Sequence, residues 1–319
     1  MKSGLLRGLL AMAGVAFISM SPAQAQQQFI TVLTGGTSGV YYPMGVALSQ
    51  IYGKAMPDAK ASVQSTKASV ENMNLLQAGR GEIAFTLGDT LSDAWKGTEE
   101  AGFKSPLKKL RGVAAIYPNY IQIVASADSG IKTLADLKGK RISVGAPKSG
   151  TELNARAIFK AAGMTYSDFS KVEYLPFGES VELMKNRQLD ATLQSAGLGV
   201  ASLRDLATSV KIVVVSIPAD VVAKVGDPAY QANVIPANTY EGQSADVPTA
   251  AVQNFLVSHE GVPADTVYKM TKAMFENMDQ LQAAHAAAKA IKKETAAKGM
   301  PLPLHPGAEK YYREAGLLK

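Results

Sequence analysis

Short apolar runs rich in β-forming residues alternate with stretches of helical periodicity over the first two thirds of the chain. The runs that predict strands lie at residues 29–33, 61–64, 83–87, 113–117, 121–126, 141–144, 172–175 and 212–215. The stretches that predict helices lie at residues 40–52, 70–78, 152–161, 180–186 and 198–207. Helices of this length suit the crossover between two parallel strands. The alternation therefore predicts an α/β fold of largely parallel sheets flanked by helices.

The pattern changes after Pro263, where one helical stretch follows another with no strand between them. Residues 279–298 are rich in alanine and lysine, which are strong helix formers, and they leave one face polar. A helix of this kind packs on the outside of a domain, and we prefer this interpretation to a partner-binding arm.

The first 25 residues have the layout of a cleavable signal peptide. Lys2 and Arg7 precede an apolar run at residues 9–20, and the small residues Ala23 and Ala25 follow it. The run is too short to cross a membrane, which takes roughly 20 apolar residues. We therefore expect a secreted chain that begins near Gln26, rather than one held by an uncleaved anchor.

The length and the composition predict two lobes. A mature chain of this length exceeds what one hydrophobic core usually serves, and 47% of the residues are hydrophobic. No low-complexity linker is present, so we expect strands to cross between the lobes. The sequence places these crossings, which would act as hinges, near residues 118–121 and 208–213.

Composition argues against several classes of function. Cysteine is absent, so neither disulfides nor thiolate chemistry contributes. The three histidines are far apart, and no His, Asp and Glu group has the spacing of metal ligands. The net charge of +6 falls by two when the signal peptide leaves, and no aromatic residues interleave with a basic stripe. Nucleic-acid binding is therefore not expected.

Three loops that join a predicted strand to a predicted helix are rich in glycine, serine and threonine: residues 34–39, 65–69 and 145–151. A helix begins with about four backbone N–H groups that lack a partner in the helix and carry partial positive charge. Short loops of small residues let an anion reach these groups, so the three loops predict one shared site for a carboxylate or phosphate. The alternative is that Ser38, Ser69 and Ser149 are only N-caps.

Enzyme signatures are missing. The residues Gly36–Thr37–Ser38–Gly39 lack the GxSxG spacing of a nucleophile elbow, and the chain has no GxxxxGK[ST] or HExxH motif. Asp89 and Asp190 end apolar runs where a general base often lies, but no His or nucleophile accompanies either of them in the sequence. The sequence predicts a binding protein that needs no cofactor, and a periplasmic enzyme on the same fold is the weaker alternative.

The chain resembles the TAXI-type solute receptors of TRAP transporters over almost the whole mature sequence. The matching segments are TGGTSGVYYPMG at 34–45, STKASVENMNLLQAGRGEIAF at 65–85, GKRISVGAPKSGTELNARAI at 139–158, LDAT at 189–192 and HPGAEKYYREAG at 305–316. This resemblance implies a two-lobe periplasmic binding protein fold of type II. Residues 26–118 and 212–319 would form lobe I, and residues 119–211 would form lobe II.

The resemblance also implies a function. Such receptors lie in the periplasm, are usually monomers, and pass an organic acid or an acidic amino acid such as glutamate to a membrane transporter driven by an ion gradient. The partners expected here are therefore a small anionic solute, such as a dicarboxylate or glutamate, and TRAP membrane subunits. The alternative from another class is a periplasmic sensor that docks on a membrane histidine kinase.

Matching motifs and strand ends supply the candidate ligand-binding residues. The motifs give Gly36, Ser38, Tyr41, Ser69, Asn72, Ser149, Gly150 and Thr151, and the strand ends and hinge add Asp89, Tyr117, Gln194 and Gly197. Lys67 and Lys148 stand where the family's loops commonly have glycine, and we expect one or both to pair with the anion unless they are only solvated loop residues. Asp89 would hold an ammonium group if the ligand is an amino acid.

Overall fold

A computed structural model describes residues 27–318 of the 319-residue chain. The predicted signal peptide and its cleavage site lie outside the described residues. The strands are β1 (Gln28–Leu33), β2 (Ala59–Gln64), β3 (Ile83–Leu87), β4 (Leu110–Ser126), β5 (Arg141–Ser143), β6 (Lys171–Glu173), β7 (Ala191–Ala196), β8 (Ile212–Val215), β9 (Tyr230–Ile235) and β10 (Val247–His259). The two predicted strands at 113–117 and 121–126 are therefore one strand, β4.

The strands form one sheet in the order β2-β1-β3-β10-β4-β7-β5-β6, with β8 beside β4 and β9 beside β10. The outer pairs, such as β1 with β2 and β5 with β7, are parallel as the βα pattern predicts. The central pairs around β4 and β10 are antiparallel. These two strands run in opposite directions along the whole molecule, and no local sequence pattern reveals that.

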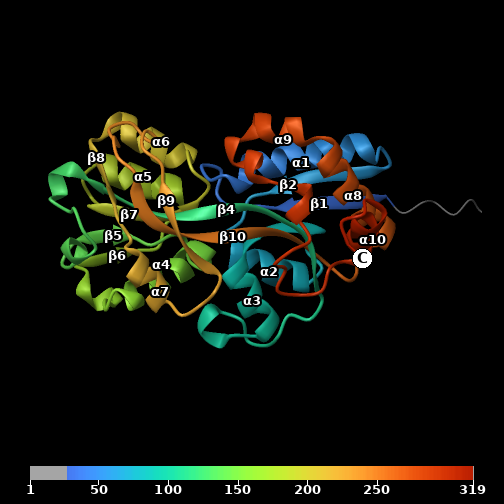
Figure 1. Cartoon of the computed structure of the whole chain (residues 1–319), viewed down its shortest axis with the longest axis horizontal. Coiled ribbons are helices and arrows are strands. Elements are labelled where there is room, and N and C mark those ends of the chain that lie inside the picture. The colour runs from blue at the N-terminus through green and yellow to red at the C-terminus, as the bar shows by residue number, and fades with distance from the viewer. Residues whose placement is uncertain (1–26, 319) are drawn as a thin grey trace, which may run out of the picture.

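Helices cover both faces of the sheet and confirm the mixed α/β class. They are α1 (Tyr41–Ala55), α2 (Ser69–Gln77), α3 (Gly88–Lys96), α4 (Gly150–Ala161), α5 (Phe177–Lys185), α6 (Ala201–Ser209), α7 (Ala219–Lys224), α8 (Ala264–Glu276), α9 (Met278–Ala284) and α10 (Pro306–Glu314). In Figure 1, α1, α5 and α6 lie on one face of the sheet, and α2, α3, α4 and α7 lie on the other.

The prediction of a single helix at residues 279–298 is wrong. Helix α9 ends at Ala284, and two short 3₁₀ segments, Ala286–Ala290 and Lys293–Thr295, replace the rest. The break lies at His285, whose backbone is extended and whose ring Nδ1 accepts a hydrogen bond from the Ala287 amide over 3.1 Å. A local side-chain contact of this kind overrides the helix preference of the alanines.

Two halves of the molecule are joined by the long strands β4 and β10 (Figure 1). We call residues 28–118 and 253–318 the first half and residues 119–252 the second half. The second of these long strands, β10, comes later in the chain than residues 208–213, where the sequence places a crossing. Strand β10 pairs with β4 only as far as Tyr120, and β8 pairs with β4 beyond that point, at residues 123–126. The chain therefore stays in the second half until β10.

Candidate functional site

A cavity of about 80 Å³ lies between the two halves, where α1, α2, α4 and α5 begin. The first half lines it with Gly35, Gly36, Gly39, Val40, Tyr41, Thr66, Lys67, Ala68, Ser69 and Leu87. The second half lines it with Asn119, Ala146, Ser149, Gly150, Thr151, Pro176, Phe177, Ser195 and Ala196. The three loops predicted to share one site therefore do meet, because the strands before them, β1, β2 and β5, end where the two halves face each other.

The helix starts make the wall of the cavity electropositive. The first amide groups of a helix have no partner inside it, and no side chain caps the start of α1, α2 or α5. Only α4 is capped, by the Ser149 hydroxyl, which accepts from the Glu152 amide over 3.1 Å. The aligned peptide dipoles add partial positive charge at each start. This arrangement can hold an anion without a buried cationic side chain.

Two residues beside the cavity have a backbone conformation that favours glycine. Ala68 has φ 71° and Lys148 has φ 60°, and each precedes the start of a cavity helix. Such conformations cost of order 1–3 kcal/mol and persist where the surrounding structure enforces them. Here the two loops contact each other, because the Glu71 amide donates to the Lys148 carbonyl over 3.3 Å. The two strained residues thus lie in the loops that form this contact between the halves.

Asn72 supports the site from behind rather than facing the cavity. Its Nδ2 donates to the carbonyls of Thr34 and Phe85 over 2.7 and 2.8 Å, and its Oδ1 accepts from the Thr66 hydroxyl over 2.7 Å. These bonds tie the ends of β1 and β3 to the loop before α2. Asn72 therefore lies outside the cavity lining, with both ends of its side-chain amide hydrogen-bonded.

A chain of buried polar groups runs beneath the cavity. The Tyr41 hydroxyl donates to Asn254 Oδ1, and Asn254 Nδ2 donates to Asn119 Oδ1 over 2.7 Å. Asn119 Nδ2 in turn donates to the Ser195 carbonyl over 2.9 Å. Burial raises the pKa of Tyr41 well above its usual range, so the phenol stays neutral. The chain links α1 to β10, β4 and β7, and so joins the two halves.

Ser195 lines the cavity with a side chain whose hydrogen-bonding capacity is unused. Its hydroxyl is buried without a hydrogen-bond partner in the described part of the chain, and the residue is only 4% exposed. Asn119 and Phe177 also line the cavity. The sequence reasoning missed all three, because they carry no motif. The one available signal was the polar end of β7, a strand that begins within the LDAT segment.

Asp89 lies outside the cavity, in a buried contact between the halves. Its Oδ2 accepts from Asn154 Nδ2 over 2.6 Å and from the Tyr230 hydroxyl over 2.7 Å. Burial raises the pKa of Asp89 to about 6, while the hydrogen bonds from Tyr230 and from the Thr90 amide lower it. Its oxygens therefore already have partners from α4 and β9.

The remaining predicted residues fall in three places. Gly36, Tyr41, Lys67, Ser69, Ser149, Gly150 and Thr151 line the cavity. Lys148 is exposed and does not line it. Tyr117, Gln194 and Gly197 lie behind it: the Tyr117 hydroxyl is buried without a partner among the described residues, and Gln194 Oε1 accepts from the Ser202 hydroxyl over 2.6 Å.

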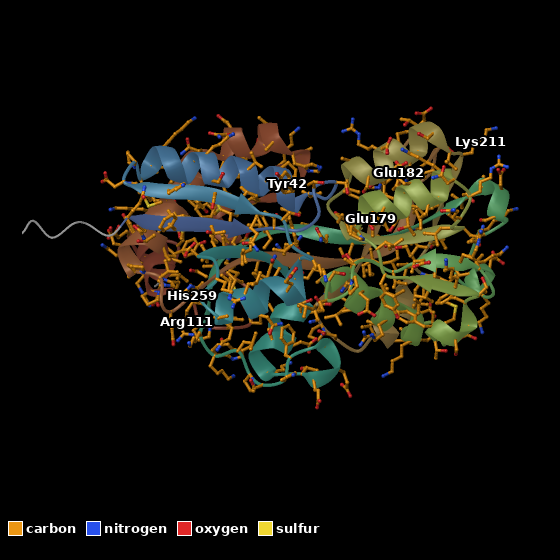
Figure 2. The ribbon with its side chains drawn as sticks, turned by 180° about the vertical axis from the view of Figure 1, so that it is seen from behind. Tyr42, Arg111, Glu179, Glu182, Lys211 and His259 are labelled. Atoms are coloured by element: carbon orange, nitrogen blue, oxygen red, sulfur yellow. The ribbon has the colours of Figure 1, made fainter. Side chains whose placement is uncertain are left out.

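Ser38 belongs to a larger groove of about 930 Å³ outside the cavity. Glu179, Glu182 and Asp205 line the second-half side of this groove. In Figure 2, Glu179 and Glu182 lie on the second half and Tyr42 lies on the first. Lys185 pairs with Glu182 and Asp205 over 3.1 and 2.6 Å, which leaves an excess of carboxylates. The groove is thus less suited to an anion than the smaller cavity, although it is larger.

Two further properties bear on the chemistry of the chain. Residues 27–318 contain no group of three or more His, Asp or Glu side chains that would hold a metal ion. None of the helices in this range combines the length and the apolar character that a membrane-spanning helix requires.

Several solved structures have the same fold. The periplasmic binding protein BugD has 10% identity and a TM-score of 0.60 over 92% of this chain and 99% of that chain. A periplasmic transporter has 13% identity and a TM-score of 0.57, with coverages of 92% and 94%. A putative L-cystine ABC transporter from Listeria monocytogenes has 17% identity and a TM-score of 0.51, with coverages of 83% and 98%. At these identities the likeness shows the fold alone, and it confirms the predicted type II periplasmic binding fold. A family model matches residues 32–316, and the chain thus belongs to the NMT1-like family.

Proposed function

We propose that the protein is a periplasmic solute receptor that closes its two halves around a small organic anion and delivers it to a membrane transporter. The observation that carries this proposal is the meeting of four helix starts from both halves at one small cavity. Each helix end contributes about 0.3–1 kcal/mol to binding an anion, and up to about 2 when partly buried. With hydroxyl donors added, this supports micromolar affinity, which requires about −8 kcal/mol.

We propose lobe boundaries that follow the strands which join the halves. Lobe I would comprise residues 26–118 and 253–319, and lobe II would comprise residues 119–252. This revises the sequence-based boundary at 212, because β8 and β9 pair with the second-half ends of β4 and β10. The hinges would then lie near Pro118 and Gln253, which pair with each other across β4 and β10.

Ligand screening tests the proposal directly. A ligand at 100 times its dissociation constant adds about 2.7 kcal/mol to the free energy of unfolding, so a thermal-shift screen of organic anions and amino acids detects micromolar binders. We expect at least one small carboxylate to raise the melting temperature and to bind with one-to-one stoichiometry in calorimetry. A screen in which no organic anion shifts the melting temperature contradicts the proposal.

The transporter partner is a separate question. The sequence resemblance favours a TRAP-type transporter driven by an ion gradient, while one protein of the same fold is named as an ABC transporter component, which would use ATP. Uptake by cells that express the receptor and its neighbouring permease distinguishes the two. Collapse of the ion gradient with an ionophore abolishes TRAP-type uptake, whereas an ABC system continues while ATP lasts. A gene for a histidine kinase beside the receptor would favour the sensor alternative.

A further inference from the structure

The residues that line the cavity include a positive charge but no negative charge, and this constrains the ligand. Lys67 is the one charged residue among the lining residues in the described chain, and its side chain is exposed. No carboxylate lines the cavity, and Asp89 already bonds Asn154 and Tyr230 away from it. A buried ammonium group without a partner is costly. The cavity therefore disfavours an amino acid, whose carboxylate would be accommodated but whose ammonium would not.

The size of the cavity sets a second limit. The 80 Å³ of the cavity is about five to eight times the 10–15 Å³ that one water molecule needs, so the cavity suits a small ligand. Apolar side chains form much of the wall, among them Val40, Leu87, Pro176 and Phe177. A second carboxylate would meet these apolar groups. Size and polarity together favour one acidic group on a short carbon chain.

The unpartnered hydroxyl of Ser195 is a third and independent observation. A buried hydroxyl normally has a partner, and its absence costs about 1–3 kcal/mol unless a ligand supplies one. Ser195 lines the cavity at the end of β7, and its own carbonyl is held by Asn119. The backbone of Ser195 is thus held in place, while its hydroxyl keeps a donor and an acceptor free.

Resting on the proposed function, we propose that the cavity binds a monocarboxylate of about three or four carbons that carries no amino group, and that the Ser195 hydroxyl bonds an oxygen of this ligand. The helix starts neutralise the carboxylate and the apolar wall receives the carbon chain. This ligand is smaller than the dicarboxylate or glutamate expected from the sequence and carries a single acidic group.

A calorimetric panel tests the ligand class. Protein freed of endogenous ligand by unfolding and refolding is titrated with pyruvate, lactate and butyrate, and then with succinate, glutamate and alanine. We expect one of the first three to bind at least tenfold more tightly than any of the last three. Tighter binding of succinate, glutamate or alanine overturns the inference but leaves the receptor function intact. Binding of no anion in this panel or in the wider screen overturns both.

Substitution of Ser195 tests the residue. Thr192 offers a matched control, because its hydroxyl is also buried on β7 without a partner among the described residues but does not line the cavity. We expect Ser195→Ala to weaken binding of the preferred monocarboxylate by about tenfold or more, since a hydrogen bond to a charged group contributes at least that much. Thr192→Val should change the affinity less than about twofold. Equal affinities of Ser195→Ala and the unaltered protein overturn the role of Ser195.

Discussion

The carboxylate of Asp89 accepts a hydrogen bond from the side-chain amide of Asn154 over 2.6 Å, and this bond joins α3 of the first half to α4 of the second. The Tyr230 hydroxyl, from β9, donates to the same oxygen over 2.7 Å. Movement of the halves away from each other would separate Asp89 from both partners and expose its carboxylate to water. The cluster is thus a contact that depends on the closed arrangement of the halves.

The first prediction concerns the pH dependence of stability. Burial raises the pKa of Asp89 from 3.8 to about 6, and nearby Asp227 and Asp93 also raise it. The folded state therefore holds the proton more tightly than the unfolded chain, so the contribution of this group is full below pH 3.8 and is lost as pH rises through about 6. Relative to Asp89→Asn, the unaltered protein should lose up to about 3 kcal/mol of unfolding free energy between pH 4 and 7.

Denaturant unfolding of both proteins at several pH values between 4 and 7.5 measures this difference. Other carboxylates, such as Asp190 beside Arg141, have lowered pKa values and act in the opposite direction, but they are common to both proteins and cancel. A difference that stays constant with pH would show that Asp89 does not titrate in this range.

The second prediction separates closure from stability. Each of two tyrosine hydroxyls makes two hydrogen bonds. The Tyr230 hydroxyl donates to Asp89 across the halves and accepts from Asn154, whereas the Tyr240 hydroxyl donates to Gln122 and accepts from the Gly199 amide within the second half. Tyr230→Phe therefore removes a hydrogen bond between the halves, and Tyr240→Phe removes none. Each change should lower the free energy of unfolding by about 1 kcal/mol. Only Tyr230→Phe should also weaken ligand binding, by about three- to tenfold. Calorimetry on the two variants checks this, and an equal loss of affinity in both would refute it.

Much of the fold follows from the sequence because strands such as β3 are buried along their whole length and appear as continuous apolar runs. The five predicted helices all form, within a few residues of their expected ends. Strand β10 was missed because Asn254 and Ser258 are buried within it and interrupt the apolar pattern. Strand β9 was missed because its middle residues are exposed and do not alternate.

The site is predictable in outline but not in its chemistry. Loops of glycine, serine and threonine at strand ends indicate the helix starts that meet in the cavity. Which strand-end residue faces the cavity depends on register, such as the pairing of Tyr120 with Ala196 between β4 and β7. Asp89, expected to face the ligand, instead bonds residues that lie far from it in sequence. Such long-range pairings leave no local sequence signal.

The third prediction concerns the two lysines near the cavity. Lys67 lines the cavity with an exposed side chain, while Lys148 is exposed and does not line it. Lys67→Ala should weaken binding of an anion by about two- to fivefold at low ionic strength, because an exposed charge attracts the ligand at long range. Salt at about 0.5 M should remove the effect through screening. Lys148→Ala is the control, and a similar loss of affinity in that variant would contradict the assignment.

The fourth prediction uses the close approach of the halves at Gly150, the first residue of α4. A Cβ atom at this position would lie 2.6 Å from Leu87 Cδ1 and 2.7 Å from Ser69 Oγ, both in the first half. Gly150→Ala should therefore obstruct closure and weaken ligand binding at least tenfold, while an open protein without ligand escapes the clash and keeps its stability. Gly53→Ala in α1 is the control, since its Cβ would meet only Ala61 at an ordinary 3.9 Å. That variant should bind normally and gain about 0.5–1 kcal/mol of unfolding free energy from helix propensity. Calorimetry and denaturant unfolding of both variants decide the matter: full affinity in Gly150→Ala would mean that ligand binding does not require this approach of α4 to Leu87 and Ser69.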